Sequence, residues 1–275
     1  MSPGIAIVVV NFNGWEDTRQ CLRSLAALRA SVILVDNDST EDRCMEFQQE
    51  FPECTIVRNQ VNGGWAGGNN TGIRIALKQN ADWVLLLNND TIVSPRLVEA
   101  LLAGAMAHPE YGIIGPVICW MDEPDKVMTD GCVFNHPDGV GFFQRREAAL
   151  APGKPLAEVE IANGCAMLVS ARVFQRIGLI DERFFLIHEE SDLCLRARRA
   201  GFRCGVLGEA LVWHKGSSSF ARSGKKLQRY YDTRNLYLLL NKHRQHPEGR
   251  GRLSSLKAYF RYVYHRYCIE REQGN

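Results

Sequence analysis

Short apolar runs alternate with amphipathic segments over residues 5–107. Four of these runs are continuous and partly β-branched, which is typical of strands covered on both faces in a parallel sheet: 5–10, 32–35, 55–57 and 83–87. Helical spacing of apolar residues predicts helices over 17–28 and 70–79. Ser94 and Pro95 match an N-cap followed by proline at the first helical position, which predicts another helix to about residue 107. This alternation predicts a doubly wound α/β half.

The pattern changes after Gly112. Apolar runs become short and are separated by glycine and proline, which predicts a mixed or antiparallel extension of the sheet over 112–118, 127–134 and 161–169. Predicted helices over 170–176 and 190–200 return to this extension, and from about residue 225 the chain is strongly helical, over 227–240 and 253–269. We therefore expect one α/β domain over 1–222, with halves 1–110 and 111–222, and a C-terminal helical extension over 223–275.

Composition and charge narrow the range of functions. The chain has 275 residues, 45% of them hydrophobic, which is enough for one large core. Its 33 basic and 31 acidic residues nearly cancel, so we expect no nucleic-acid partner. No apolar run approaches the about 20 residues that cross a bilayer, and no basic segment precedes the first run, so a cytoplasmic location is expected. The nine scattered cysteines are interpreted as buried free thiols.

Polar clusters follow three of the first four predicted strands. Ligands of open α/β sheets bind beyond the carboxyl ends of the strands, so these clusters are expected to meet in one crevice. Each cluster alone could be ordinary turn chemistry, but three in register indicate a site. The clusters are Asn11-Phe12-Asn13-Gly14, Asp36-Asn37-Asp38-Ser39 and Asn88-Asn89-Asp90.

Asp90 is the only charged residue of its cluster. A carboxylate at the end of a buried strand suits a hard divalent cation that also bridges diphosphate oxygens. Asn88 and Asn89 would orient substrate or brace the loop. A carboxylate of the Asp36/Asp38 pair can accept hydrogen bonds from a base or a ribose.

The segment 62–70 is dense in glycine and leads into a predicted helix. Such segments let backbone N–H groups approach a phosphate or a sugar. The glycine spacing is not that of the dinucleotide fingerprint, and the segment follows the third strand, not the first. A flexible connector is the weaker interpretation because the segment runs directly into a helix.

A second polar group opens the helix predicted near residue 190. Glu189, Glu190 and Asp192 lie in its first turn, where the helix dipole favours negative charge, and Asp192 can pair with Arg196. A transferase also needs a carboxylate to accept a proton, and the residues alone favour neither interpretation. His214 ends a later apolar run and, taken in isolation, would more commonly be structural.

Taken together and in order, these segments resemble the inverting family 2 glycosyltransferases, particularly the rhamnosyltransferase-like branch. The resemblance covers roughly residues 5–240, and the ordered set is highly specific although each piece is only modestly so. The matching segments are 8–14, 34–40, 62–72, 87–91, 163–168, 178–185, 189–196 and 213–214.

The resemblance implies a GT-A fold, with a central, mostly parallel sheet flanked by helices. Residues 1–110 would be the nucleotide-sugar-binding half and 111–222 the acceptor-binding half of the catalytic domain. Asp90 and His214 would bind Mn²⁺ or Mg²⁺. The residues expected at the donor are Asn11, Asn13, Asp36, Asp38, Asn62, Gly67, Asn70, Asn88 and Asn89, and those at the acceptor are Gly164, Cys165 and Glu189.

In such enzymes the catalytic base is the second acid of a Glu-Asp pair, a position that Glu190 occupies here. The carboxylate is kept but lies one methylene further out, which leaves Asp192 and Glu189 as alternatives. The implied reaction is a single in-line displacement that inverts the anomeric centre, in which Glu190 deprotonates the acceptor hydroxyl and the metal neutralises the leaving diphosphate. His188 stands where an aromatic residue is typical.

The expected function is transfer of a sugar from a dTDP- or UDP-sugar to a saccharide, lipid-linked or small-molecule hydroxyl, in the biosynthesis of cell-surface polysaccharides, glycolipids or glycosylated metabolites. Because Glu190 departs from the family pattern, an alternative stays open: a catalytically weakened subunit that binds nucleotide sugar. A sugar nucleotidyltransferase is a poorer fit because 11–14 lacks a glycine-rich, basic signature. The basic, aromatic segment 253–269 can lie on an anionic membrane surface, although packing against the domain is slightly favoured.

Overall fold

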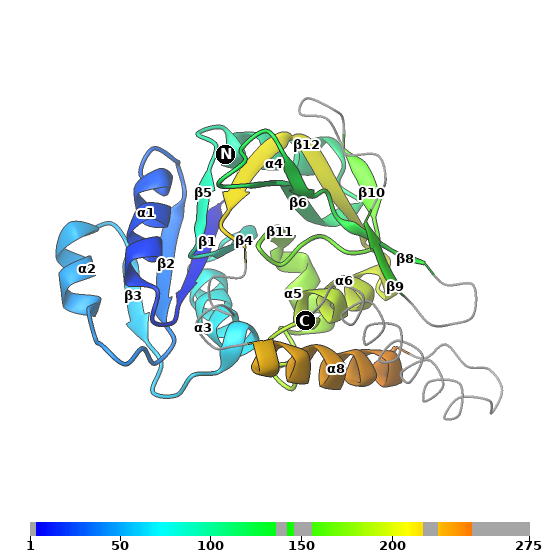
Figure 1. Ribbon diagram of the computed structural model, residues 1–275. Coiled ribbons are helices and arrows are strands. Elements are labelled where there is room, and N and C mark those ends of the chain that lie inside the picture. The colour runs from blue at the N-terminus through cyan, green and yellow to red at the C-terminus, as the bar shows by residue number, and fades with distance from the viewer. Residues whose placement is uncertain (1–3, 136–141, 146–155, 217–224, 244–275) are drawn as a thin grey trace.

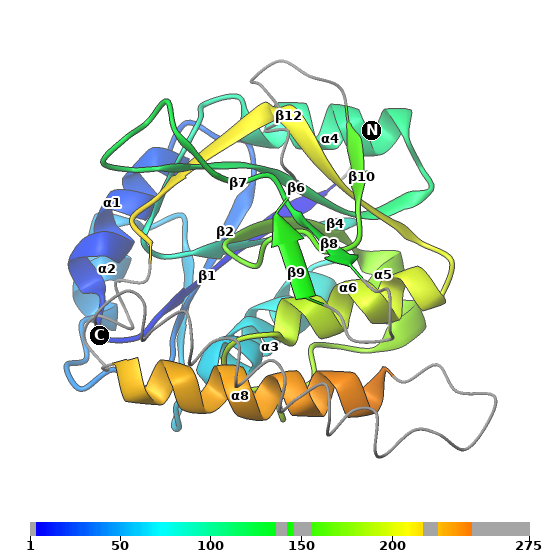
Figure 2. The ribbon, with the colours of Figure 1, turned by 45° about the vertical axis from the view of Figure 1, so that its right-hand side comes forward.

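The computed structural model describes residues 4–135, 142–145, 156–216 and 225–243. A large sheet forms the centre, with helices on both faces (Figures 1 and 2). Its strand order is β3-β2-β1-β4-β11-β6-β12-β10. The first four strands pair in parallel, as predicted: β1 (Ile5–Asn11), β2 (Ser31–Asp36), β3 (Thr55–Arg58) and β4 (Trp83–Asn88).

The second half adds the mixed extension that the sequence predicts. β11 (Ala166–Ser170) runs antiparallel to β4 and to β6 (Tyr111–Trp120), whereas β12 (Arg203–His214) runs parallel to β6. Shorter strands pair antiparallel with this part: β5 (Thr91–Val93) and β10 (Ala157–Val159) with β12, and β7 (Val127–Thr129) with β6. β8 (Cys132–Asn135) and β9 (Phe142–Arg145) form a separate pair. The fold is thus the predicted α/β class.

Seven helices lie in the described residues: α1 (Trp15–Leu25), α2 (Cys44–Glu50), α3 (Gly64–Lys78), α4 (Leu97–Ala107), α5 (Ala171–Ile177), α6 (Glu189–Arg199) and α8 (Lys225–Lys242). The prediction was wrong at the start of α3, because the glycine-rich segment is helical from Gly64. α4 also starts later than predicted, since Leu97 N donates to Ser94 O in a preceding turn. The predicted helix 253–269 lies outside the described residues. None of the described helices has the length and apolar content that crossing a membrane needs.

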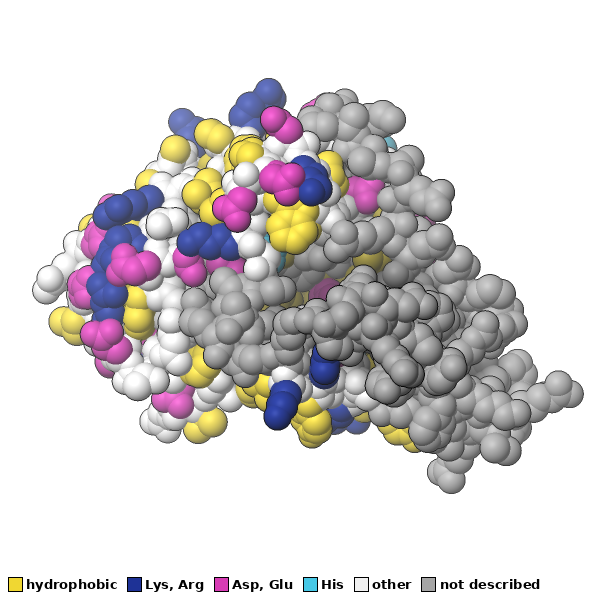
Figure 3. Space-filling view, in the orientation of Figure 1, with side chains coloured by type: hydrophobic (Ala, Val, Ile, Leu, Met, Phe, Trp, Pro, Cys, Tyr) yellow, Lys and Arg dark blue, Asp and Glu magenta, His cyan; other side chains and the backbone are white. Residues whose placement is uncertain are grey.

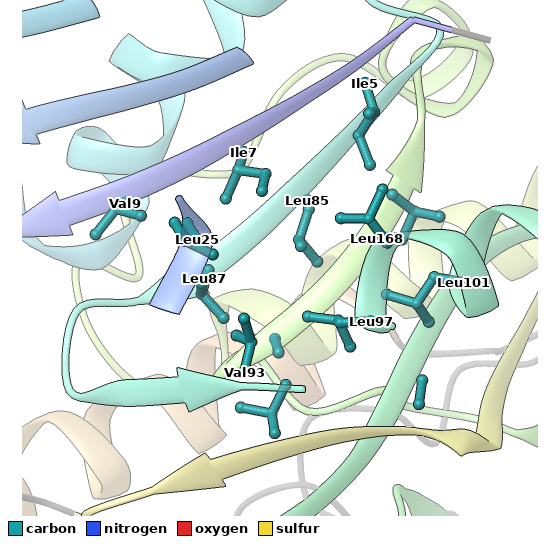
Figure 4. Close-up of a cluster of buried hydrophobic side chains, with 14 of the residues drawn as sticks. Ile5, Ile7, Val9, Leu25, Leu85, Leu87, Val93, Leu97, Leu101 and Leu168 are labelled. Carbon is teal, nitrogen blue, oxygen red and sulfur yellow. The ribbon is translucent and has the colours of Figure 1, made fainter. Parts of the chain in front are cut away.

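The side chains of β1 alternate between two buried clusters. Ile5, Ile7 and Val9 pack with α1 and α4 on one face (Figure 4), and Ala6 and Val8 pack with α3, α5 and α6 on the other. All are at most 8% exposed, which explains why the strand is continuously apolar. Acidic and basic side chains alternate over α1 and α2 (Figure 3), where Arg19 pairs with glutamates of both helices.

Two glycines bring α3 close to β1. A Cβ at Gly72 would lie 2.3 Å from Val8 Cγ1, and one at Gly68 would lie 2.6 Å from Val10 Cγ1. Any larger residue would force the helix away from the strand. At these two positions, therefore, close packing explains the glycine. This packing holds the first turn of α3 over the carboxyl ends of the parallel strands.

Candidate functional site

The carboxyl ends of β1, β2 and β4 meet at one edge of the sheet, as predicted. Asn11 is in register with Asp36, and Val10 with Asn88. Asn11 Nδ2 donates to Asp36 Oδ1 at 3.1 Å and to Ser39 Oγ at 3.0 Å. Asn11 and Asp36 have no exposed surface. These two side chains therefore lock the ends of neighbouring strands together beneath the site.

Arg58 joins the second cluster from the end of β3. Its Nη1 lies 2.8 Å from Asp36 Oδ2, and its Nη2 lies 3.8 Å from Asp38 Oδ1. Asp38 adopts a left-handed conformation (φ 67°), and its side chain is 43% exposed. Of the two carboxylates, Asp38 is therefore the one directed toward solvent.

Asn37 ties the turn before α3 to the end of β2. Its Nδ2 donates to Asn62 Oδ1 and to Gly64 O, both at 2.9 Å. Gly64 has φ +67°, and a Cβ there would lie 2.2 Å from Phe185 O, so only glycine fits. Gly67, by contrast, faces open space, with nothing within 4 Å of its added Cβ. The turn is held rigidly, and Gly67 is the position where a ligand can approach α3.

Two predicted donor residues brace distant segments. Asn70, 1% exposed, donates to Ile180 O at 2.8 Å and accepts from Ile180 N at 3.0 Å. Asn13 Oδ1 accepts from Thr40 N at 2.8 Å. Asn70 thereby connects α3 to the 180s segment, and Asn13 connects the loops after β1 and β2.

Asn88 and Asn89 form hydrogen bonds with different neighbours of the loop after β4. Asn89 Nδ2 donates to Thr18 Oγ1 at 2.9 Å and braces the loop against α1. Asn88 Oδ1 accepts from Trp65 Nε1 at 2.9 Å, and Asn88 N donates to Cys165 O at 2.8 Å. Asn88 thus links α3 and the start of β11 at the end of β4.

Asp90 and His214 lie together although 124 residues separate them in sequence. β5 and β12 pair Thr91 with His214, which brings His214 Nε2 to 3.0 Å from Asp90 Oδ1. Both side chains are largely buried, and His214 Nδ1 makes no hydrogen bond. Burial disfavours the imidazolium, but contacts with Cys165 and the Asp90 carboxylate outweigh burial and raise the pKa of His214 to about 10.

This pair fits a divalent cation that displaces the proton from His214 Nε2 when it binds. Two donors about 2.1 Å from one ion at adjacent corners of an octahedron are about 3.0 Å apart, which matches the observed separation. Within the described residues, no group of three or more His, Cys, Asp or Glu side chains could hold a metal. A cation at Asp90 and His214 would therefore take its other ligands from water or from a bound diphosphate.

Glu190 lies beside Gly164 and Trp65. A Cβ at Gly164 would lie 3.1 Å from Glu190 Cβ and 3.5 Å from Trp65 Cζ2, so the three residues meet at one point. Gly164 precedes Cys165, whose carbonyl binds Asn88. A short chain of contacts thus joins the Glu190 side of the site to the loop that carries Asp90.

Asp192 has a different environment. It has no exposed surface and lies 2.7 Å from Arg196, 2.8 Å from Lys242 and 2.7 Å from His243. Burial alone would raise the pKa of the Asp192 carboxyl, but these partners together lower it. The carboxylate is therefore enclosed by cations that tie α6 to the end of α8.

Glu189 is 5% exposed, and its Oε2 makes no hydrogen bond. Burial, together with the charge of Glu190, raises the pKa of the Glu189 carboxyl well above its usual range. Glu189 therefore holds its proton more tightly than an ordinary glutamate side chain does.

Glu189→Gln is expected to flatten the pH dependence of stability. The pKa of Glu189 in the folded protein lies above its value in the unfolded chain, which is about 4.3. Between these two pKa values, folding takes up a proton. The free energy of unfolding of the unaltered protein should then fall as pH rises, by up to about 1.4 kcal/mol per pH unit, until the folded pKa is passed. Urea denaturation from pH 5 to pH 8 measures this slope. Glu53→Gln, at an exposed position, is the control, and equal slopes in all three proteins would contradict the assignment.

Sequence reasoning missed four contributors to this region: Trp65, Arg58, Asp232 and Asn235. Trp65 was visible as the one large side chain within a run of glycines. Asp232 and Asn235 were visible only as two of several polar residues in the predicted helix over 227–240. Asp232 Oδ1 lies 3.1 Å from His188 Nε2, which explains the histidine at a position where an aromatic residue is typical. Arg58 gave no distinguishing signal.

Comparisons with known proteins agree with the geometry. The sequence matches the family described as "Glycosyltransferase like family 2" over residues 3–233. It is 29% identical to the low-salt glycan biosynthesis hexosyltransferase Agl10 of Haloferax volcanii, over 88% of this chain and 76% of that protein. It is 26% identical to an N-acetylglucosaminyl-diphospho-decaprenol L-rhamnosyltransferase of Mycobacterium tuberculosis, over 81% of this chain and 79% of the relative.

Solved structures share the fold at 15% sequence identity. GalNAc-T7 with UDP, GalNAc and Mn²⁺ superposes with a TM-score of 0.62, covering 77% of this chain and 43% of that one. Residues 1–349 of Staphylococcus aureus TarS in complex with UDP-GlcNAc superpose with a TM-score of 0.57, covering 86% of this chain and 66% of that one. The chain therefore spans less than two thirds of either structure, and the shared part has the same architecture.

Proposed function

The chain belongs to glycosyltransferase family 2, and from this premise we propose that it transfers a hexose from a nucleotide diphosphate to an acceptor hydroxyl, with inversion and with the help of a divalent cation. The observation that carries the proposal is the placement of two chemically different groups around Asn88 and Gly164. Asp90, two residues after Asn88, pairs with His214, and Glu190 lies beside Gly164, whose neighbour Cys165 binds Asn88 through its carbonyl.

A nucleotide-sugar donor fits the edge of the sheet. Asp38 is exposed there for hydrogen bonds from a base or ribose, and Gly67 leaves α3 open to a phosphate or sugar. The other predicted donor residues hold this surface in shape, as Asn11 and Asn62 do by their side-chain bonds. GalNAc-T7 and TarS carry UDP or a UDP-sugar in their structures, which supports a donor of this class.

Asp90 and His214 would hold Mn²⁺ or Mg²⁺. When bound, the cation would neutralise charge on the leaving diphosphate as a Lewis acid. The separation of the two donor atoms and the shortage of further protein ligands both suit an ion that is completed by the donor's own oxygens.

Glu190 is the proposed base. It is partly exposed beside Gly164, whereas Asp192 is enclosed by Arg196, Lys242 and His243, and Glu189 is buried with a raised pKa. A carboxylate must reach the acceptor hydroxyl directly or through one water to take its proton. Of the three acids, Glu190 is the best placed to do so, and Gly164 and Cys165 would line the acceptor beside it.

The relatives narrow the acceptor class. One is named for hexose transfer in glycan biosynthesis and another for rhamnose transfer to a diphospho-decaprenol-linked sugar. We propose a saccharide acceptor, carried on a lipid diphosphate, and a dTDP- or UDP-sugar donor. The enzyme would work in the cytoplasm at the inner face of the membrane. The segment 253–269, which can lie on an anionic membrane surface but was expected to pack on the domain, lies outside the described residues.

A donor panel tests the proposal. The full chain is incubated with dTDP-rhamnose and UDP-hexoses, with Mn²⁺ or with EDTA, and release of nucleoside diphosphate is measured with and without a lipid-diphosphate-linked sugar. Release from one donor that requires both Mn²⁺ and acceptor is the expected result, and the anomeric configuration of the product tests inversion. Tight donor binding without release would favour a binding subunit, and no binding would contradict the proposal.

A further inference from the structure

The turn before α6 has an unusual backbone conformation. Phe185, Ile187 and His188 all have positive φ, at 62°, 73° and 72°. The left-handed region is unfavourable for residues other than glycine, and a β-branched residue such as Ile187 is a strong exception. Such a conformation persists only where its surroundings fix it, and it clusters at functional sites.

Asn235 of α8 supplies the main restraint on this turn. Its side chain has no exposed surface, and its Nδ2 lies within hydrogen-bond distance of three carbonyl oxygens of the turn, which share its two N–H groups: Phe184 O at 2.6 Å, Leu186 O at 2.7 Å and Ile187 O at 2.8 Å. Those carbonyls converge on one point only because the turn has this conformation. The amide therefore stabilises the strained backbone directly.

Two neighbours on α8 contact the same turn. The rings of Tyr231 and Phe185 stack with centroids 5.1 Å apart, and Asp232 pairs with His188. Positions 231, 232 and 235 fall on one side of a helix. α8 runs alongside α3 and α6 in both views of the ribbon (Figures 1 and 2). Three residues of α8 thus contact the turn, and the helix is part of the structure that holds it.

The turn leads directly into the proposed base. His188 O accepts a hydrogen bond from Asp192 N at 3.0 Å in the first turn of α6. The position of His188 therefore fixes the start of α6, where Glu189 and Glu190 lie. On its other side, Phe185 O accepts from Ala66 N at 3.2 Å at the start of α3. The turn therefore sets the spacing between the base and the helix that approaches the donor.

We propose that Asn235 is a positioning residue: by holding Phe185, Ile187 and His188 in their left-handed conformation, it aims Glu190 at the acceptor hydroxyl. This inference rests on the proposed function, because it takes Glu190 as the base. Asn235 itself contacts no substrate and acts only through the turn.

The test compares Asn235→Ala with Asn241→Ala in the full chain. Asn241 is on the same helix and partly buried, and no hydrogen bond of its side chain is described. Loss of the Asn235 amide should lower kcat about 10- to 100-fold, because a small displacement of a reacting group is costly, while the Kd for nucleoside diphosphate changes less than about twofold. Asn241→Ala should match the unaltered protein in both quantities.

A second-site change separates positioning from general stability. Glycine adopts positive φ freely, so Ile187→Gly added to Asn235→Ala should restore kcat about fivefold. An unchanged kcat in Asn235→Ala, or a loss of kcat that Ile187→Gly does not relieve, would overturn the inference.

Hydrogen exchange tests the turn without any turnover. Asn235→Ala should speed amide exchange in 186–192 and leave β1 and β4 protected. If the unaltered protein transfers no sugar, the proposed function fails, yet this measurement still reports on the turn. Unchanged exchange in 186–192 would overturn the positioning role even where the transferase activity is established.

Discussion

Asp90→Asn is expected to lower kcat for sugar transfer by about 10³-fold and to remove its dependence on Mn²⁺. The substitution keeps the size of the side chain but removes its charge, beside His214 at 3.0 Å. Stabilisation of a leaving group by a preorganised charge is commonly worth about 3–4 kcal/mol, which corresponds to this loss. Stopped assays of nucleoside diphosphate release measure the rate, and paramagnetic resonance of Mn²⁺ measures binding of the ion independently of turnover.

The matched control for that experiment flanks the same strand, β4. Asp82 precedes β4 at the opposite end from Asp90, and its Oδ2 accepts a hydrogen bond from Gly4 N at 2.8 Å. Asp82→Asn should keep kcat within about twofold and should bind Mn²⁺ normally. Unaltered Mn²⁺ binding by Asp90→Asn would contradict the metal assignment, whatever its activity.

Glu190→Gln should lower kcat about 10²- to 10⁴-fold without weakening donor binding. The amide fills the same space beside Gly164 and Trp65 but cannot accept the acceptor's proton, and removal of a general base commonly has an effect of this size. Transfer rates at saturating donor and acceptor, together with calorimetric binding of nucleoside diphosphate, separate the proton-transfer role from a binding role.

Two further substitutions identify the base among its neighbours. Glu190→Asp keeps a carboxylate with shorter reach and should retain more activity than Glu190→Gln. Asp192→Asn removes a charge that Arg196, Lys242 and His243 surround. It should therefore lower the urea midpoint of unfolding clearly while changing kcat little. Near-normal transfer by Glu190→Gln, with loss of transfer by a folded Asp192→Asn, would make Asp192 the base.

Much of the fold could be predicted because, in the first half of the chain, the local pattern of apolar residues agrees with the strands that form. The run Ile5–Val10 is apolar at every position since both faces of β1 are covered, and that pattern is visible in the sequence. The start of α3 could not be predicted in the same way. Gly64 begins the helix with a positive φ fitted against Phe185, more than 100 residues away, and Gly68 and Gly72 are set by contact with β1. Local propensity opposes such a helix, and tertiary packing decides it.

Several residues of the candidate site could be predicted from the sequence, but the contacts between residues that are distant in sequence could not. Strand-end positions identified Asp36 and Asp90 because parallel strands deliver their carboxyl ends to one edge. Their partners come from elsewhere: Arg58 reaches Asp36 from the end of β3, and His214 reaches Asp90 through the β5–β12 pairing. The support of α8 for the turn before Glu190 also depends on distant contacts, which periodicity does not encode.

The pairing of β12 with β5, which is distant in sequence, has a consequence for the growing chain. Synthesis proceeds from the N-terminus, so β1 to β4 and Asp90 emerge well before His214, the last residue of β12. Pairing over so long a loop is slow, since its closure entropy precedes the contacts that reward it. A partly made chain therefore has a sheet edge ready for a nucleotide but only one of the two proposed metal ligands. Under the proposed function, sugar transfer would then await synthesis of β12, and a chain that ends before His214 would not consume nucleotide sugar.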